Sequence, residues 1–115
     1  MPPRIEHYAF GTIMIDGRIY RSDVIVLPDR VLPDWWRGTG HSLTLSDLRV
    51  VVADPPATLI IGTGASGGMA VPAETIDALE AMGIEVLVRP TGEAVEVYGR
   101  LSPGGGVAAA LHLTC

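Results

Sequence analysis

The sequence predicts a single three-layer α/β domain with a mixed central sheet, a parallel βαβ crossover and an N-terminal antiparallel hairpin. Three observations lead to this prediction. Alternating apolar residues flank Asp16-Gly17, a wholly apolar run at Leu59-Ile60-Ile61 precedes a helical pattern and a second apolar run, and the stretch 107–113 is uncharged. Short apolar runs separated by a helix are typical of parallel strands buried on both faces.

The composition bounds the classes of function. One domain over residues 1–115 fits the usual size of about 100–150 residues, and 48% hydrophobic residues are enough for a packed core. The net charge of −5 argues against a nucleic-acid partner and an anionic membrane surface. Every basic residue is Arg, which excludes a Schiff-base lysine, and the single Cys excludes an intrachain disulfide.

The first half of the chain is predicted to be mostly extended. Alternation over residues 8–15 predicts a strand, and Asp16-Gly17 supplies the positive φ pair of a two-residue hairpin turn. A second strand is expected over 18–27, where the charged interruption at 21–23 suggests a bulge or an exposed edge. Residues 28–40, with two prolines and two glycines, are expected to be irregular.

Helices and buried strands are predicted to alternate in the second half. A short helix over 46–53 has Ser46 as its N-cap and Asp47 in its first turn. A longer helix starts at Pro72 and ends at Gly83, and it is expected to bury Ala73, Ile76, Leu79 and Met82. A buried strand over 84–88, a helix over 91–101 capped by Thr91, and a central strand over 107–113 complete the domain.

The glycine-rich segment after Leu59-Ile60-Ile61 is the first candidate site. It matches both a dinucleotide pattern (G-x-G-x-x-G) and a nucleophile-elbow pattern. The helix starts too late for the first, and for the second Asp77 lies on a helix face and Ser66 well past the end of its strand, although Asp77 and His112 follow in the right order. A weaker hypothesis keeps its backbone amides as a nest for a carboxylate or phosphate. A turn that only needs flexible glycines is the favoured interpretation. The ligand-binding candidates are Gly62, Thr63, Gly64, Ser66, Gly67, Arg89 and His112.

The histidines give no support to a metal site. His7, His41 and His112 are far apart in the sequence and have no clustered carboxylates. His112 lies on the predicted central strand, where a histidine satisfied within the core is the favoured interpretation. We therefore predict no catalytic residues, no metal ligands and no cofactor.

Trp35 and Trp36 are the candidates for partner binding. Adjacent side chains of an extended segment point to opposite sides, so only one of the two rings can enter the core. The other either covers the sheet edge or anchors a partner, since Trp is enriched in binding hot spots. The sequence favours cover over anchoring.

Several segments together resemble a known family. They are the Asp16-Gly17 hairpin with Tyr20, residues 33–36, Leu59 to Gly64, Met82-Gly83-Ile84, Thr91 to Val95 and Ala110 to Cys115. Their order resembles a family of small single-domain proteins of unknown molecular function that includes the adipogenesis-associated conserved-domain protein and mitochondrial complex I assembly factor three. The resemblance implies a three-layer α/β fold and no known cofactor or catalytic residue. Gly99 departs from the family, whose members often have Asn there.

Two hypotheses of function follow. The first is a non-enzymatic protein-interaction or assembly-helper domain with an unknown protein partner. The alternative is a small-molecule or anion-binding protein, or an enzyme acting on such a ligand, with its site at the Gly62–Gly68 loop. No apolar leader segment follows Met1-Pro2-Pro3-Arg4, so we expect a cytoplasmic protein without membrane contact. A homo-oligomer is left open.

Overall fold

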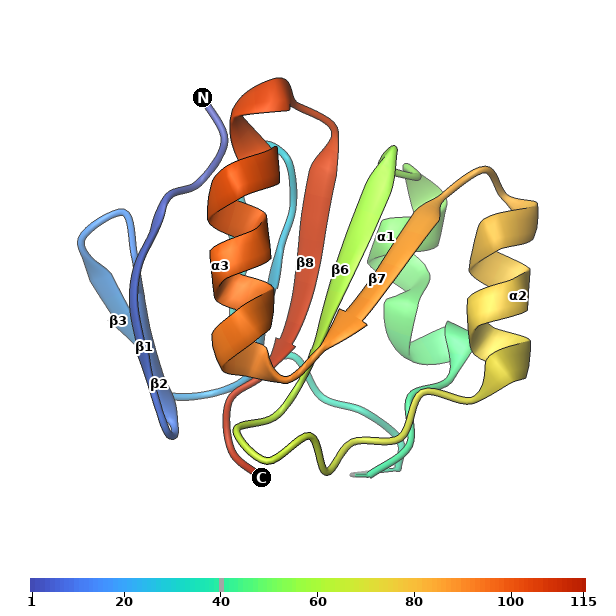
Figure 1. The fold of residues 1–115 in the computed structure, drawn as a ribbon, viewed down its shortest axis with the longest axis horizontal. Coiled ribbons are helices and arrows are strands. Elements are labelled where there is room, and N and C mark those ends of the chain that lie inside the picture. Colours follow the sequence, from blue (N-terminus) through green and yellow to red (C-terminus); the bar gives the residue numbers. More distant parts are fainter. Residues whose placement is uncertain (40) are drawn as a thin grey trace.

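The computed structural model describes residues 1–39 and 41–115. Gly40, the last residue of the segment predicted to be irregular, lies outside the described residues. Figure 1 shows the elements, whose bounds are β1 (Ile5–Ala9), β2 (Thr12–Ile15), β3 (Arg18–Tyr20), β4 (Val24–Val26), β5 (Val31–Leu32), η1 (a 3₁₀ turn, Leu45–Leu48), α1 (Arg49–Ala53), β6 (Thr58–Thr63), α2 (Ala73–Ala81), β7 (Glu85–Arg89), α3 (Thr91–Leu101), η2 (Ser102–Gly104) and β8 (Val107–His112).

Two sheets and their covering helices make three layers. Among the described residues, β1, β2 and β3 form one antiparallel sheet, and the other has the order β5-β4-β8-β6-β7. One face of the larger sheet packs against α3 and the smaller sheet through a core that contains Ile13, Ala94 and Tyr98. The other face packs against α1 and α2 through Val51 and Leu79 (Figure 1). The predicted fold class is confirmed.

Strands β6 and β8 form the centre of the larger sheet. β6 runs parallel to both β7 and β8, whereas β4 pairs with β8 in the antiparallel sense, so the sheet is mixed. Leu59, Ile60 and Ile61 have no solvent exposure, as their uninterrupted apolar run predicts. β8 is buried along its whole length and central, also as predicted.

The N-terminal hairpin is confirmed, but the strand before it is shorter than predicted. Asp16 and Gly17 have φ angles of 50° and 79° and connect β2 to β3. Residues 8–15 do not form one strand, because the chain turns at Phe10-Gly11 and β1 pairs back on β2. Residues on both sides of that turn continue the alternation, which is why the pattern alone concealed it.

The strand predicted over 18–27 is wrong as a single element. β3 belongs to the smaller sheet and β4 to the larger one, so residues 21–23 carry the chain between sheets rather than form a bulge. β4 is not an edge strand either, because it lies between β5 and β8. The edge strand on this side of the larger sheet is β5, a short strand inside the segment expected to be irregular, which pairs with β4 after a tight turn.

The predicted helices are present, and their ends differ in detail. The helix expected over 46–53 begins as η1 after Thr44, whose amide is bound by the Asp47 carboxylate, so Ser46 is not the cap. α2 starts after Pro72 and buries Thr75 and Leu79. Ala73 and Met82 are exposed, contrary to prediction, because the buried residues are spaced by four instead of three.

Two further corrections concern the segment 84–101. β7 is the edge of the larger sheet, so its apolar residues are only half-buried. α3 follows Pro90, and Thr91 does not cap it. Instead the Thr91 hydroxyl donates to the His112 carbonyl and accepts from the Gly64 amide, which binds three elements together. No helix in the described part of the chain is long and apolar enough to cross a membrane.

Candidate functional site

A buried charged cluster lies where β4 and β8 meet at one end of their ladder. Val24 pairs with Leu111, so the same antiparallel register places Asp23 opposite His112. Asp23 Oδ2 lies 2.8 Å from His112 Nδ1, and the Leu113 amide donates to Asp23 Oδ1 at 2.8 Å. Cross-strand pairing thus joins two residues that are 89 positions apart in the sequence.

Arg37 completes this group, which we call the Asp23 cluster (Asp23, Arg37 and His112). Arg37 Nη1 donates to Asp23 Oδ2 at 2.7 Å, and its Nη2 lies 3.1 Å from His112 Nδ1. The side chains of Asp23, Arg37 and His112 are only 14%, 7% and 8% exposed. Charges buried this deeply are tolerated because they are paired and hydrogen-bonded.

The carboxylate of the Asp23 cluster stays ionised at neutral pH. Burial by itself would raise the pKa of Asp23. The hydrogen bonds from His112, the Leu113 amide and Arg37 outweigh burial and hold the pKa below its ordinary value. The ionised carboxylate is therefore the acceptor on which Arg37 and His112 converge.

The Asp23–His112 pair has the form of an oriented general base, but the structure gives it no nucleophile. His112 Nδ1 faces both Asp23 Oδ2 and Arg37 Nη2, so the ring nitrogen left to act as a base toward a substrate would be Nε2. Nε2 is buried, and no hydroxyl or thiol of the described residues hydrogen-bonds to it. A triad needs a nucleophile within hydrogen-bond reach of that nitrogen. The cluster instead positions the chain around Arg37.

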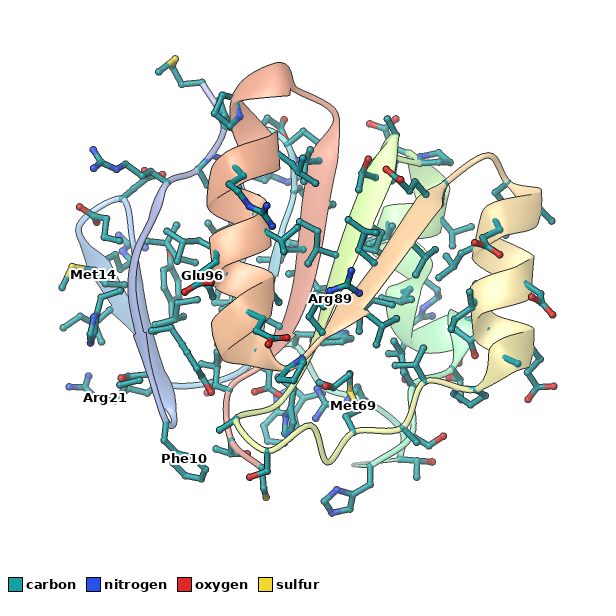
Figure 2. All side chains as sticks on the ribbon, in the orientation of Figure 1. Phe10, Met14, Arg21, Met69, Arg89 and Glu96 are labelled. Carbon is teal, nitrogen blue, oxygen red and sulfur yellow. The ribbon has the colours of Figure 1, made fainter. Side chains whose placement is uncertain are left out.

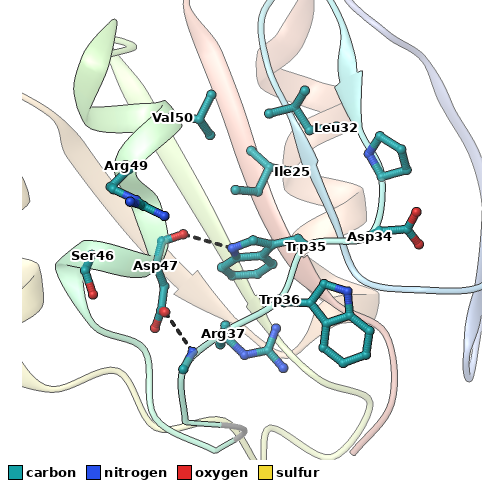
Figure 3. A pocket seen from close by; sticks show the side chains of 12 residues that line it. Ile25, Leu32, Asp34, Trp35, Trp36, Arg37, Ser46, Asp47, Arg49 and Val50 are labelled. Atoms are coloured by element: carbon teal, nitrogen blue, oxygen red, sulfur yellow. Dashed lines mark hydrogen bonds between the residues drawn. The ribbon is translucent and has the colours of Figure 1, made fainter.

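The segment 34–38 is held from both sides. The Trp35 amide donates to the Asp23 carbonyl at 2.9 Å, and the Trp35 indole N–H donates to the Asp47 carbonyl at 2.9 Å. The Gly38 amide donates to Asp47 Oδ1, and the Arg37 guanidinium lies 4.9 Å from the centre of the Trp35 ring. These contacts, two of which Figure 3 marks with dashed lines, fix the backbone that carries Trp36.

Trp36 projects from this fixed segment into solvent. Its side chain is 83% exposed, whereas Trp35 is half-buried, so the two rings point to opposite sides as predicted. A Trp with this exposure is unusual, because large aromatic side chains are normally well covered. The favoured interpretation, in which the second ring covers the sheet edge, does not account for the exposure of Trp36.

Two grooves flank Trp36, and we call Trp36 together with both grooves the Trp36 surface. The larger groove has a volume of about 770 Å³ and the smaller about 340 Å³, and both are lined by Trp35, Trp36 and Arg37. Figure 3 shows the side chains that line the larger groove, with the Trp35 indole directed towards Asp47 and the Trp36 ring directed away from it. The larger one also includes Ile25, Leu32, Pro33 and Val50, and the smaller one includes Arg21, Ser22 and Thr114.

Each groove of the Trp36 surface includes an exposed cation. Arg21 lines the smaller groove and Arg49 the larger one, and both are exposed. The ion pairs of the described residues join Arg37 and His112 to Asp23 and Arg30 to Asp29, so neither Arg21 nor Arg49 takes part in one. Asp34 adds an exposed negative charge to the larger groove. The smaller groove is thus the more positive of the two.

The glycine-rich loop has its amides in use. The nest hypothesis needs N–H groups that point to a common empty position. Here the loop amides donate to groups within the chain, which leaves few donors for an anion. The Thr63 hydroxyl is also in use, because Oγ1 donates to the Arg89 carbonyl. The bonds run from Gly64 to Thr91 Oγ1, from Ala65 to Thr114 O, from Gly67 to Gly64 O and from Gly68 to Cys115 O.

The remaining loop candidates do not converge on one pocket. Gly62 pairs with Arg89 on one side and Leu111 on the other, and a Cβ at Gly62 would lie 2.9 Å from a side-chain atom of Leu111. Gly62 is therefore required for packing. Arg89 lies on β7 and His112 on β8, with β6 between them, so their backbones are about 10 Å apart. Ser66 is exposed.

Asp23 and Arg37 are site residues that the sequence did not single out. The local signal for Asp23 is a charge directly before the apolar run of β4, but such a charge equally indicates a bulge or an exposed edge. Arg37 follows the Trp pair, and nothing local marks it as buried. Of the predicted residues, His112 and Trp35 both contact Arg37. Arg37 directly follows Trp36, so these two predicted residues lie next to Trp36 as well.

Comparison with known proteins agrees with the fold. A conserved hypothetical protein of Pyrococcus horikoshii OT3 is similar over 97% of this chain and 99% of its own, with a TM-score of 0.86 and 28% identity. The protein MT938 is similar over 98% and 99%, with a TM-score of 0.81 and 29% identity. The Rpa2829 protein of Rhodopseudomonas palustris is similar over 97% and 87%, with a TM-score of 0.78 and 26% identity.

The family suggested by the sequence motifs is confirmed as one of unknown function. Residues 5–112 match the model of a family described as protein of unknown function (DUF498/DUF598). That match spans both sheets and reaches from the start of β1 to the end of β8. The chain therefore belongs to the DUF498/DUF598 family.

Proposed function

We propose that this protein is a protein-interaction module that binds an extended peptide segment of a partner across the Trp36 surface. The observation that carries the proposal is the 83% exposure of Trp36 between two grooves. Tryptophan contributes large binding energies at interfaces when its ring enters or forms a pocket. A peptide laid over Trp36 would fill both grooves and cover that ring.

The fixed backbone of segment 34–38 supports this function. Binding costs less entropy when the contact residues are already held in the bound conformation. Trp35 and Arg37 are held by Asp23 and Asp47, so Trp36 is presented without a large rearrangement. Asp23 and His112 thereby support binding by holding segment 34–38 in position, whereas Arg37 also lines both grooves.

The lining of the grooves defines the chemistry of the peptide. Ile25, Leu32, Pro33 and Trp35 favour an apolar or proline side chain in the larger groove. Arg21 in the smaller groove favours a carboxylate at the other end of the segment. Because the chain carries a net charge of −5, a strongly acidic partner would be repelled at long range. An extended segment with one or two acidic residues next to an apolar one fits best.

Selection of binders from a random-peptide display library tests the proposal. We expect the selected peptides to combine an acidic residue with proline or an aromatic residue. Trp36→Ala should weaken their binding at least about tenfold, the loss that marks a residue of moderate importance at an interface. Arg21→Glu should weaken it too, and added salt should reduce the Arg21 effect.

Phe10→Ala is the matched control. Phe10 is 65% exposed, like Trp36 an exposed aromatic residue, but it lies in the β1–β2 turn of the smaller sheet (Figure 2). Its replacement should leave peptide affinity unchanged. A library that yields no binder, or binders whose affinity survives Trp36→Ala, contradicts the proposal.

A further inference from the structure

The outer strand of the larger sheet has an unusual sequence. β7 is Glu85-Val86-Leu87-Val88-Arg89 and pairs only with β6 among the described strands. Its ends are charged and exposed, and its three central apolar residues are half-buried. Read from either end, the strand has a charge, three apolar residues and the opposite charge. Two antiparallel copies of such a strand are complementary to each other.

The backbone of β7 faces outward at two residues. The Glu85 amide donates to the Ala57 carbonyl at 2.9 Å, so Glu85 faces β6. Backbone groups alternate along a strand, which turns the amides and carbonyls of Val86 and Val88 away from β6. The guanidinium of Arg89 donates to the Val88 carbonyl at 2.7 Å, as expected if that carbonyl lies at the sheet edge.

We propose that β7 pairs antiparallel with β7 of a second copy of this chain, with the two-fold axis at Leu87. In this register each Val86 lies opposite Val88 of the other copy, and the pair exchanges two backbone hydrogen bonds. Leu87 packs on Leu87 of the other copy. Glu85 lies opposite Arg89 of the other copy at both ends. There the Arg89 guanidinium gives up its contact with the Val88 carbonyl and binds the Glu85 carboxylate instead.

Both faces of the joined sheet gain apolar cover. Leu87 packs with the core on the α3 side, whereas Val86 and Val88 pack with the core on the α1 and α2 side. The pairing therefore extends each core by one side-chain layer across the two-fold axis. A five-residue strand is about 17 Å long, so the interface is small and the dimer is expected to be weak and concentration-dependent. β7 lies at the opposite edge of the sheet from β5, so this interface is independent of the Trp36 surface.

A charge-swap series tested by sedimentation velocity decides the proposal. The wild-type protein should shift from monomer to dimer between about 10 μM and 1 mM, the range of weak complexes. Glu85→Arg and Arg89→Glu should each weaken dimerisation about tenfold or more, because each places like charges opposite each other at both ends. The double variant Glu85→Arg/Arg89→Glu restores opposite charges and should restore the dimer.

Val88→Pro tests the backbone contacts separately. Proline removes an amide that faces away from β6, so the fold should persist while the dimer is lost. If this variant does not fold, the charge-swap series still decides. Trp36→Ala should leave dimerisation unchanged, which separates this proposal from the proposed function. A wild-type protein that stays monomeric over the whole range, or a double variant that is no better than the single ones, overturns the proposal.

Discussion

Replacing Asp23 with Ala removes the carboxylate that orders the Trp36 segment. Its Oδ2 accepts from Arg37 and lies against His112, and its Oδ1 accepts from the Leu113 amide. The Arg37 and His112 side chains are only 7% and 8% exposed, so water cannot fully replace the lost acceptor. Breaking a buried ion pair by removing one partner costs about 3–5 kcal/mol. Because Asp23 itself is 14% exposed, we expect the low end, about 3 kcal/mol.

This loss converts into a large change of melting temperature. With an unfolding entropy of about 2.1 cal/mol/K per residue, a chain of 115 residues has about 0.24 kcal/mol/K, so 3 kcal/mol lowers the melting temperature by about 12 °C. Differential scanning calorimetry and urea titration at pH 7 measure both quantities. Asp29→Ala is the control, because the Asp29 and Arg30 side chains are 75% and 56% exposed, and it should change stability by less than about 0.5 kcal/mol.

The same site makes stability depend on acid. The pKa of Asp23 is lowered in the folded state, so the unfolded chain binds a proton first as pH falls. The contribution of Asp23 is fully present above the unfolded pKa of about 3.9 and is lost as pH falls through the lower folded value. Asp23→Asn should therefore lose less stability on acidification than wild type.

An Asp23→Ala variant that melts within about 2 °C of wild type refutes the structural role given to this cluster.

Three further predictions concern packing and a buried hydrogen bond elsewhere in the fold. Gly62→Ala should destabilise the protein by about 1–3 kcal/mol, because a Cβ there would lie 2.9 Å from side-chain atoms of both Leu111 and Thr91. Gly99→Ala in α3 meets nothing within 4 Å and should stabilise the protein by about 0.5–1 kcal/mol. Urea titration measures both, and a Gly62→Ala protein as stable as wild type contradicts this packing. Tyr98 donates to the Pro3 carbonyl, and burial raises its pKa to about 12. The contribution of Tyr98 to stability is present below the unfolded pKa of about 10 and is lost as pH rises towards 12. Tyr98→Phe should therefore lower the free energy of unfolding by about 1 kcal/mol at pH 7, and the variant should lose less stability than wild type between pH 10 and 12. An unchanged alkaline loss contradicts the assignment.

The parts of the fold that follow from local pattern were predictable. Leu59-Ile60-Ile61, bounded by Pro and Gly, is typical of a buried strand, and Asp16-Gly17 is typical of a tight hairpin turn. Each signal lies within a few residues, so it can be recognised locally. What failed was the pairing of distant segments. The charges at 21–23 have the same local appearance whether they form a bulge or carry the chain from one sheet to another. Only the register of β4 on β8 distinguishes the two cases.

The candidate site was half-predictable for the same reason. Two adjacent Trp residues on an extended segment imply that one ring is exposed, and the structure places Trp36 there. The Asp23 cluster depends on a contact across 89 positions, and Arg37 gives no sign in the sequence of being buried. The glycine-rich loop matches the sequence motif of a binding site. Its glycines instead allow close packing, as at Gly64, where a Cβ would lie 2.6 Å from the Cys115 backbone.

The most direct test of the Trp36 surface is a titration of ¹⁵N-labelled protein with a selected peptide, followed by two-dimensional NMR. The account predicts that the largest shifts fall on the indole N–H of Trp36 and on the amides of Arg21, Arg37 and Arg49. The amides of Ala65 and Ser66 and those of β7 should stay unchanged. Shifts concentrated in the glycine-rich loop, with the Trp36 indole signal unmoved, would contradict the account.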